Sequence, residues 1–191
     1  MARFESELQA LALLDHPHIA RLYDAGVSED GRPYYVMQAV PGVPITEYCD
    51  EHRLGTADRL RLLQVCHAVQ HAHDRGIVHR DIKPSNVLVL TVDGQPVAKI
   101  IDFGVAKATN QHLTEATVYT EIGRAIGTPA YMSPEQAAMT EEGVDHRTDI
   151  YALGVLLYEI LVGDPPLGLG SYSTLAFDEI VRRIREDEPR T

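Results

Sequence analysis

The sequence contains little cysteine, and its cysteines follow no recognisable pattern. Its 191 residues include two of them, Cys49 and Cys66. Two cysteines are too few for a disulfide framework, and their spacing matches no zinc motif. We therefore predict that both are small buried hydrophobic residues in a protein of the reducing cytoplasm.

Basic residues and long apolar segments are also scarce. The chain has 17 Lys and Arg against 28 Asp and Glu, a formal net charge of -11. Because nucleic-acid binders usually carry a basic face, nucleic acid is not an expected partner. The longest mainly apolar stretch, 150–162, contains a glutamate and is shorter than the roughly 20 residues that span a bilayer. The N-terminal "MARFESELQA" has no signal-peptide core, so neither a membrane segment nor secretion is expected.

What the chain does contain suits one globular domain of the α+β class. Hydrophobic residues make up 45% of it and charged residues 24%, and we find no internal repeat. Periodicity and turn signals predict a small sheet with one helix, followed by a mostly helical body. The expected elements are a helix over 2–14, a hairpin of strands 19–25 and 34–40, helices over 46–52 and 56–75, a hairpin of strands 87–90 and 97–101, a helix after Asp149 that ends at Val162, and a helix over 177–184.

Two local features define the long helix expected over 56–75. Thr56 can cap its start and Gly76 can end it. Its predicted buried face consists of Leu62, Val65, Cys66, Val69 and Ala72.

The chemistry concentrates between residues 77 and 104, "IVHRDIKPSNVLVLTVDGQPVAKIIDFG". Asn86 and Asp102 supply the oxygen ligands that Mg²⁺ favours, and Lys83 can reach a phosphate in the same pocket. Asp81 can accept the proton of an incoming hydroxyl group. Such residues also populate ordinary turns. Two groups of them, one on each side of a predicted hairpin, argue against chance and predict phosphoryl transfer.

Glu7 lies on or beside the apolar face of the first predicted helix, three residues after Phe4 and four before Leu11. A glutamate at such a position is either solvated at the edge of the helix or available to pair with a buried cation. The residues alone leave both alternatives open.

Four motifs together resemble the bacterial type of serine/threonine protein kinase, over nearly the whole chain. "HRDIKPSN" fits H-R-D-x-x-x-x-N and is followed by "DFG". "GTPAYMSPEQA" resembles the end of the family's activation segment, and "DHRTDIYALGVLLYEILVG" resembles the central helix of its large lobe. The resemblance implies a kinase-like fold that transfers the γ-phosphoryl group of ATP, with Mg²⁺, to serine or threonine hydroxyls of protein substrates.

The resemblance also implies a role for individual residues. Asp81 would be the catalytic base, Lys83 the phosphate contact, and Asn86 and Asp102 the magnesium ligands. Arg80 would contact a phosphorylated activation loop, in which Thr117 and Thr120 are candidate sites, and Asp149 would brace the backbone of the catalytic loop. The predicted nucleotide contacts are Met37, the main chain of Gln38 and Val40, Leu88, and Glu7, which stands where the family has the glutamate that pairs with the ATP-binding lysine. Lys83 and Thr128 of "GTP" point to Ser/Thr rather than Tyr specificity.

The chain departs from the family pattern at both ends. No glycine-rich loop or lysine strand precedes Glu7, and Lys83, Lys99 and Lys107 cannot stand in for the missing lysine. Glu135 lacks the arginine that later helices supply in the family. We therefore expect a domain truncated at both ends, with a small-lobe remnant over 1–40 and a large lobe over 41–191, and with impaired ATP binding.

Three other functions compete with this prediction. A pseudokinase or regulatory module without catalysis would explain the missing lysine. A small-molecule phosphotransferase related to aminoglycoside kinases would share the catalytic loop, but Lys83 and "GTPAYMSPEQ" disfavour it. A metal site of His67, His71 and His73 is weaker, because no third ligand is evident beyond two imidazoles one helical turn apart.

Overall fold

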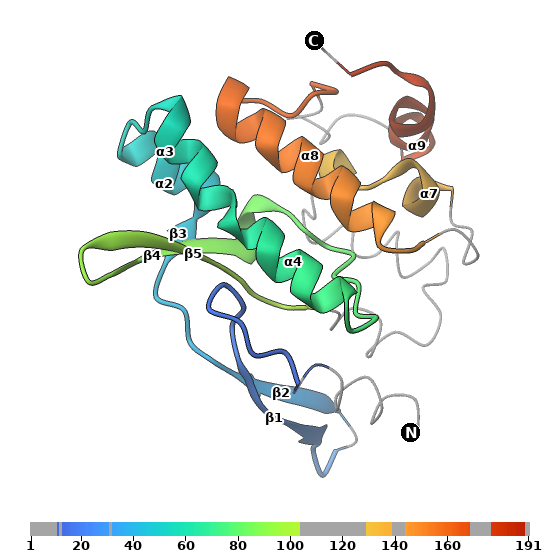
Figure 1. Cartoon of the computed structure of the whole chain (residues 1–191). Helices are drawn as coiled ribbons and strands as arrows, with labels where there is room; N and C mark the ends of the chain where they lie inside the picture. The colour runs from blue at the N-terminus through green and yellow to red at the C-terminus, as the bar shows by residue number, and fades with distance from the viewer. Residues whose placement is uncertain are drawn as a thin grey trace.

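The computed structural model describes residue 11 and residues 13–30, 32–103, 129–138, 144–168 and 177–189. Two small antiparallel sheets are combined with a group of helices, which confirms the α+β prediction. Helices α2, α3, α4 and α8 lie on one side of the three-stranded sheet, and the two-stranded sheet lies on the other (Figure 1). Most of the predicted first helix, and the segment 104–128, fall outside the described residues.

The first predicted hairpin is confirmed as β1 (Leu22–Val27) and β2 (Pro33–Met37), which pair antiparallel with Gly26 opposite Tyr34. The first strand begins later than predicted, because residues 19 and 20 bond to a different partner. The N–H group of Ala20 donates to the carbonyl of Ile100 at 2.8 Å, and Ile19 forms a parallel bridge with Ile100. This segment therefore joins the small sheet to the second hairpin.

The second hairpin consists of β4 (Val87–Val92) and β5 (Gln95–Ile100), with the short strand β3 (Val43–Pro44) beside β4. Asp93 and Gly94 form its turn with φ angles of 50° and 75°. Asp-Gly suits such a turn because both residues tolerate the left-handed region. The prediction is confirmed, although the strands extend further toward the turn than expected.

The helix predicted over 56–75 is divided. Helix α2 (Ile45–Glu51) precedes it as expected, and α3 (Thr56–Arg61), the 3-10 turn η1 (Leu62–Gln64) and α4 (Val65–His73) then follow in succession. Gly76 ends the segment with a φ of 72°, as predicted. Thr56 is not the cap: the N-cap is Gly55, and no side chain bonds to the first N–H groups.

The 3-10 turn also changes which residues of α4 face the core. Leu62, Val65, Val69 and Ala72 are buried as predicted, but Cys66 is exposed and Ala68 is buried instead. Residues i and i+3 eclipse in a 3-10 turn, which places Leu62 directly above Val65 and moves the apolar stripe away from Cys66. The prediction of a buried Cys66 is wrong, whereas that of Cys49 is confirmed.

Helix α8 (Arg147–Val162) begins two residues before Asp149, which therefore lies in its first turn rather than before it. The Arg147 N–H donates to the carboxylate of Asp145 at 2.8 Å, which stabilises the earlier start. The remaining elements are η2 (Pro84–Asn86), η3 (Pro129–Tyr131), α7 (Pro134–Ala137) and α9 (Phe177–Glu186). Among the described helices, none is both long and apolar enough to cross a membrane.

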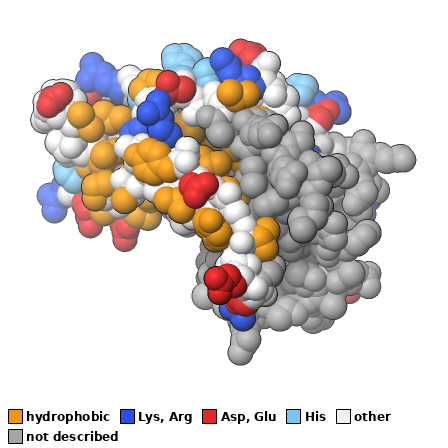
Figure 2. All heavy atoms as spheres, turned by 90° about the horizontal axis from the view of Figure 1, so that it is seen from below, with side chains coloured by type: hydrophobic (Ala, Val, Ile, Leu, Met, Phe, Trp, Pro, Cys, Tyr) orange, Lys and Arg blue, Asp and Glu red, His pale blue; other side chains and the backbone are white. Residues whose placement is uncertain are grey.

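One apolar core joins the helices to the second hairpin. Six of its fully buried members show that it draws on distant parts of the chain: Ile45, Val65, Val87, Ile100, Leu156 and Ile160. On the face drawn in Figure 2, Lys and Arg side chains of the described part are scattered among acidic and hydrophobic ones.

Arg59 stabilises the join between the α2–α3 connection and the end of α8. Its guanidinium donates to the carbonyls of Leu54 at 2.8 Å and Ile160 at 2.7 Å, and to the Asp50 carboxylate at 3.0 Å. We expect Arg59→Ala to lower the free energy of unfolding by about 2–4 kcal/mol, because the carbonyls lose their charged donor. Urea denaturation measures the change.

Arg61→Ala is the matched control for Arg59→Ala. The Arg61 side chain is 77% exposed, and its one ion pair within the described part of the chain is with Asp58, at 2.9 Å. Its removal should cost less than about 0.5 kcal/mol. Equal losses in the two variants would contradict a specific role for Arg59.

Candidate functional site

The second hairpin brings Asn86 and Asp102 to the same edge of the sheet. Val87 pairs with Ile100 at the end of the ladder, and the N–H of Ile101 donates to the carbonyl of Asn86 at 3.0 Å just beyond it. Asp102 follows directly, exposed and with a φ of 60°. Few non-glycine residues adopt such a φ angle, and those that do cluster in turns and functional loops.

Asp81 lies beside the two other polar residues of its motif. Its Oδ2 accepts hydrogen bonds from Lys83 Nζ at 2.7 Å and Asn86 Nδ2 at 3.0 Å. Asn86 Nδ2 also donates to the Asp81 carbonyl at 2.8 Å, so these bonds use the amide nitrogen and leave its oxygen for another partner. The structure thus brings Asp81, Lys83 and Asn86 together, as the sequence predicts.

His79 ties this loop to the segment that carries Asp102. Its ring is 1% exposed, and Nε2 lies 3.0 Å from the Ile101 carbonyl while Nδ1 accepts the N–H of Asp81 at 3.2 Å. Burial lowers the pKa of this imidazole despite the opposing effect of Asp149. A neutral ring protonated at Nε2 satisfies both bonds. Its edge packs on Phe103, with ring centroids 4.6 Å apart.

Asp149 fixes the backbone of the same loop by accepting hydrogen bonds from its N–H groups. Its side chain is completely buried, and its two oxygens accept the N–H groups of His79 at 2.8 Å and Arg80 at 2.7 Å. His73 Nε2 lies 2.7 Å from the same carboxylate. Arg80 has a φ of 69°, so the carboxylate stabilises a backbone turn that a non-glycine residue rarely adopts.

The segment from Ser133 to Gln136 is anchored on the same loop. Ser133 and Gln136 form a capping box at the start of α7, and Gln136 Nε2 donates to the Arg80 carbonyl at 2.8 Å. Glu135, expected to lack the arginine partner of the family, accepts a hydrogen bond from the Thr148 hydroxyl at 2.8 Å. Burial alone would raise the pKa of Glu135, but its hydrogen bonds and the Arg147 charge lower it below the usual value.

The residues predicted to contact a nucleotide lie where β2 leaves the small sheet. The Gln38 N–H donates to the Arg21 carbonyl at 2.7 Å, and the Val40 carbonyl accepts the Gly42 N–H at 2.8 Å. Met37 ends β2, and Leu88 is half-buried on β4, where it pairs with Lys99 of β5. The predicted residues Glu7, Thr117, Thr120 and Thr128 lie outside the described residues.

An open groove of about 520 Å³ begins beside Lys83. Glu159 and Asp164 line it, and Tyr131 donates its hydroxyl to Glu159 across its floor. Burial, together with the charges of Asp164 and Asp50, raises the pKa of Glu159 to about 7. Sequence reasoning missed this groove, as it missed His73 and Gln136, although a glutamate within the apolar run of α8 was a visible signal.

The raised pKa of Glu159 predicts that stability falls as the pH rises through neutrality. Its ordinary value is 4.5, so between 4.5 and about 7 the folded state binds more protons than the unfolded state. We expect Glu159→Gln to gain roughly 1–2 kcal/mol relative to the wild type between pH 5 and pH 8, as measured by urea denaturation. The exposed Glu186→Gln is the control, and parallel pH profiles for wild type and Glu159→Gln would contradict the prediction.

The histidine alternative finds no support. Within the described ranges, no group of three or more His, Cys, Asp or Glu side chains could hold a metal ion. His73 instead bonds to Asp149, and His67 is exposed on α4.

The chain is similar to proteins whose names describe one activity. The protein kinase domain model matches residues 2–188. Serine/threonine-protein kinase Pkn1 of Myxococcus xanthus is 40% identical over 188 residues, which cover 98% of this chain and 26% of the relative. Serine/threonine-protein kinase PknB of Mycobacterium leprae is 36% identical over 192 residues, which cover 97% of this chain and 28% of the relative. The chain therefore spans little more than a quarter of these relatives, and it belongs to the protein kinase domain family.

Proposed function

We propose that this chain is the catalytic part of a serine/threonine protein kinase, which transfers the γ-phosphoryl group of ATP to hydroxyl groups of protein substrates. One observation carries the proposal: Asp81 bonds to both Lys83 and Asn86, and the Asn86 carbonyl accepts the N–H of Ile101, the residue that precedes Asp102. Base, cation and oxygen ligands thus converge at the edge of one hairpin, as phosphoryl transfer requires.

Asp81 is the proposed base. It is exposed, so an incoming hydroxyl can approach its carboxylate, and its backbone is fixed by His79 and Asn86. Lys83 lies within hydrogen-bond distance of the same carboxylate. It can therefore contact the γ-phosphoryl group that the substrate hydroxyl attacks. The groove beside Lys83 is the proposed path of the substrate chain.

Mg²⁺ would be held by the Asn86 side-chain oxygen and the Asp102 carboxylate. The donor set fits, because both are hard oxygen ligands and Asn86 uses its amide nitrogen for Asp81. The ion would neutralise phosphate charge. Asn86 would orient the phosphate against Asp81, while His79 keeps the two loops in register.

The adenine of ATP would lie against residues 37–40 and Leu88. The bonds made by Gln38 and Val40 use the N–H of the first and the carbonyl of the second. They leave the carbonyl of Gln38 and the N–H of Val40 to pair with an adenine edge. We further propose that phosphorylation of Thr120 or Thr117 places a charge near Arg80, and that the protein acts in the cytoplasm, where ATP is available.

Transfer of labelled γ-phosphate tests the proposal. The protein is incubated with Mg²⁺ and ATP and with a serine- and threonine-containing protein substrate, with and without EDTA. We expect label on serine or threonine that EDTA abolishes. A matched reaction with an aminoglycoside as acceptor tests the small-molecule alternative.

Each outcome separates the candidates. Label on the protein substrate supports the kinase, and label on the aminoglycoside alone supports the small-molecule phosphotransferase. Absence of transfer to either acceptor, in a protein that a thermal-shift assay shows to be folded, contradicts the proposal and favours a binding module.

A further inference from the structure

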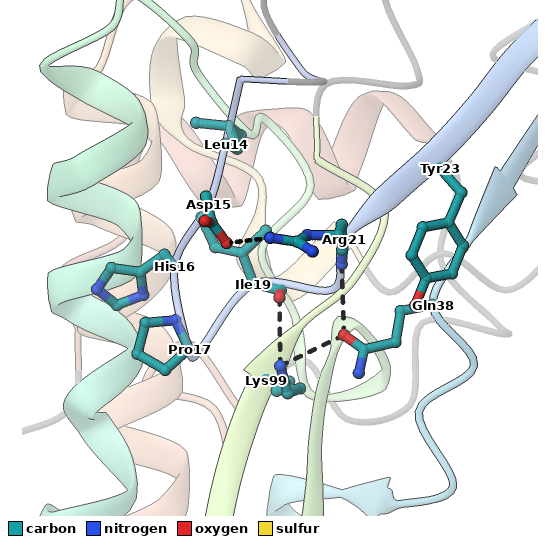
Figure 3. A pocket seen from close by; sticks show the side chains of 9 residues that line it. All are labelled: Leu14, Asp15, His16, Pro17, Ile19, Arg21, Tyr23, Gln38 and Lys99. Carbon is teal, nitrogen blue, oxygen red and sulfur yellow. Dashed lines mark hydrogen bonds and ion pairs between the residues drawn. The ribbon is translucent and has the colours of Figure 1, made fainter.

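A second pocket lies away from Asp81, between the segment 14–23, the end of β2 and strand β5. It has a volume of about 220 Å³, and Figure 3 shows the side chains that line it. Its polar members are Asp15, His16, Arg21, Tyr23, Gln38 and Lys99. None of the roles proposed above uses the side chains that meet here.

Lys99 enters this pocket without a carboxylate partner. Its ammonium group is half-buried and lies 3.4 Å from both the Ile19 carbonyl and Gln38 Oε1, the long end of the hydrogen-bond range. Burial and the charge of Arg21 lower the pKa of this ammonium group. No ion pair to Lys99 exists among the residues that the structure describes, and a partly desolvated cation without one is costly.

Further basic groups surround Lys99. Arg21 donates one N–H to Asp15 at 2.8 Å, the one carboxylate among the pocket's described residues, and a guanidinium has five N–H donors. Burial lowers the pKa of His16, and the charges of His18, His71, His67 and Lys99 lower it further. The pocket is thus locally basic in a chain whose net charge is -11.

We propose that this pocket binds a phosphoryl group, held by the Lys99 ammonium and the Arg21 guanidinium. These two cationic donors come from separate segments of the chain, and a phosphoryl group accepts charge-assisted hydrogen bonds from both. The volume is below the roughly 300–1,000 Å³ of sites for drug-sized ligands, so the pocket fits free phosphate or the head of a phosphorylated side chain. This site is independent of phosphoryl transfer at Asp81.

Ligand-dependent thermal unfolding tests the site. The protein is titrated with inorganic phosphate and with O-phosphothreonine, against sodium chloride at equal ionic strength and against threonine. We expect both phosphates to raise the melting temperature and both controls to leave it unchanged. Tighter binding of phosphothreonine would assign a phosphorylated side chain as the source, and tighter binding of phosphate a free ion.

Three variants locate the binding. Lys99→Gln should weaken phosphate binding about tenfold or more, as loss of a charge-assisted contact predicts, and Arg21→Gln provides a second test if Lys99→Gln does not fold. Arg32→Gln, whose side chain is 85% exposed, is the matched control and should bind normally. Lack of stabilisation by phosphate would overturn the proposal, and so would binding that Lys83→Gln abolishes while Lys99→Gln retains it.

Discussion

Asp81→Asn is expected to reduce phosphoryl transfer by about 10²–10⁴-fold while leaving the fold intact. The substitution keeps the shape of the side chain but removes the negative charge that would accept the hydroxyl proton. The Asp81 side chain is 49% exposed, and its bond to Lys83 is a partly exposed ion pair. The free energy of unfolding should therefore change by less than about 1 kcal/mol.

Steady-state transfer of labelled phosphate and urea denaturation together measure this result. Asp93→Asn provides a matched control, because Asp93 is exposed in the β4–β5 turn at a φ of 50° that asparagine also tolerates. Its activity should match the wild type. Full activity of Asp81→Asn would remove Asp81 from the proposed mechanism, whereas a large loss of stability would assign it a structural role.

Asp149→Asn is expected to lower the free energy of unfolding by about 2–4 kcal/mol, although Asp149 belongs to no loop motif. Both oxygens of this buried carboxylate accept N–H groups, from His79 and Arg80. An amide offers one oxygen, so its NH₂ group must face an N–H donor in either orientation. The Arg80 backbone then loses the contact that stabilises its left-handed conformation.

Amide hydrogen exchange distinguishes this local effect from general destabilisation. Exchange of the His79 and Arg80 amides should accelerate more than exchange within β4, and phosphoryl transfer should fall in the molecules that remain folded. Asp145→Asn makes the same change near the start of α8 and should have little effect, because Asp145 is solvent-accessible and an asparagine oxygen still accepts the Arg147 N–H. Equal exchange and stability in both variants would contradict the role of Asp149.

Local patterns predicted much of the fold. Both hairpins were predicted from an Asp-Gly sequence between apolar stretches, and Gly76 ends its helix because glycine adopts a positive φ without strain. The division at η1 was not predictable in this way, because the apolar spacing of 62–72 fits a continuous helix almost as well. Cys66 was misplaced for the same reason.

The candidate site likewise combines features that the sequence predicted with features that it did not. The spacing of Asp81, Lys83, Asn86 and Asp102 drew attention to them. The first three meet within one loop, and the hairpin places Asn86 beside the residue that precedes Asp102. The contact of His73 with Asp149 joins residues far apart in the chain, and no periodicity reports it. The hydrogen bond that Thr148 donates to Glu135 was likewise not predicted from the sequence.

The sequence by itself determined the family motifs, the hairpins and the identity of the polar residues, because these depend on residue type, short spacing and turn chemistry. The tertiary structure alone decided that His73 contacts the buried carboxylate of Asp149, that Glu159 has a raised pKa, and that Lys99 lies in a locally basic pocket. Burial and the distances between charges depend on packing across the whole chain. The energies of these groups could therefore be assigned only after the segments that surround them had been placed.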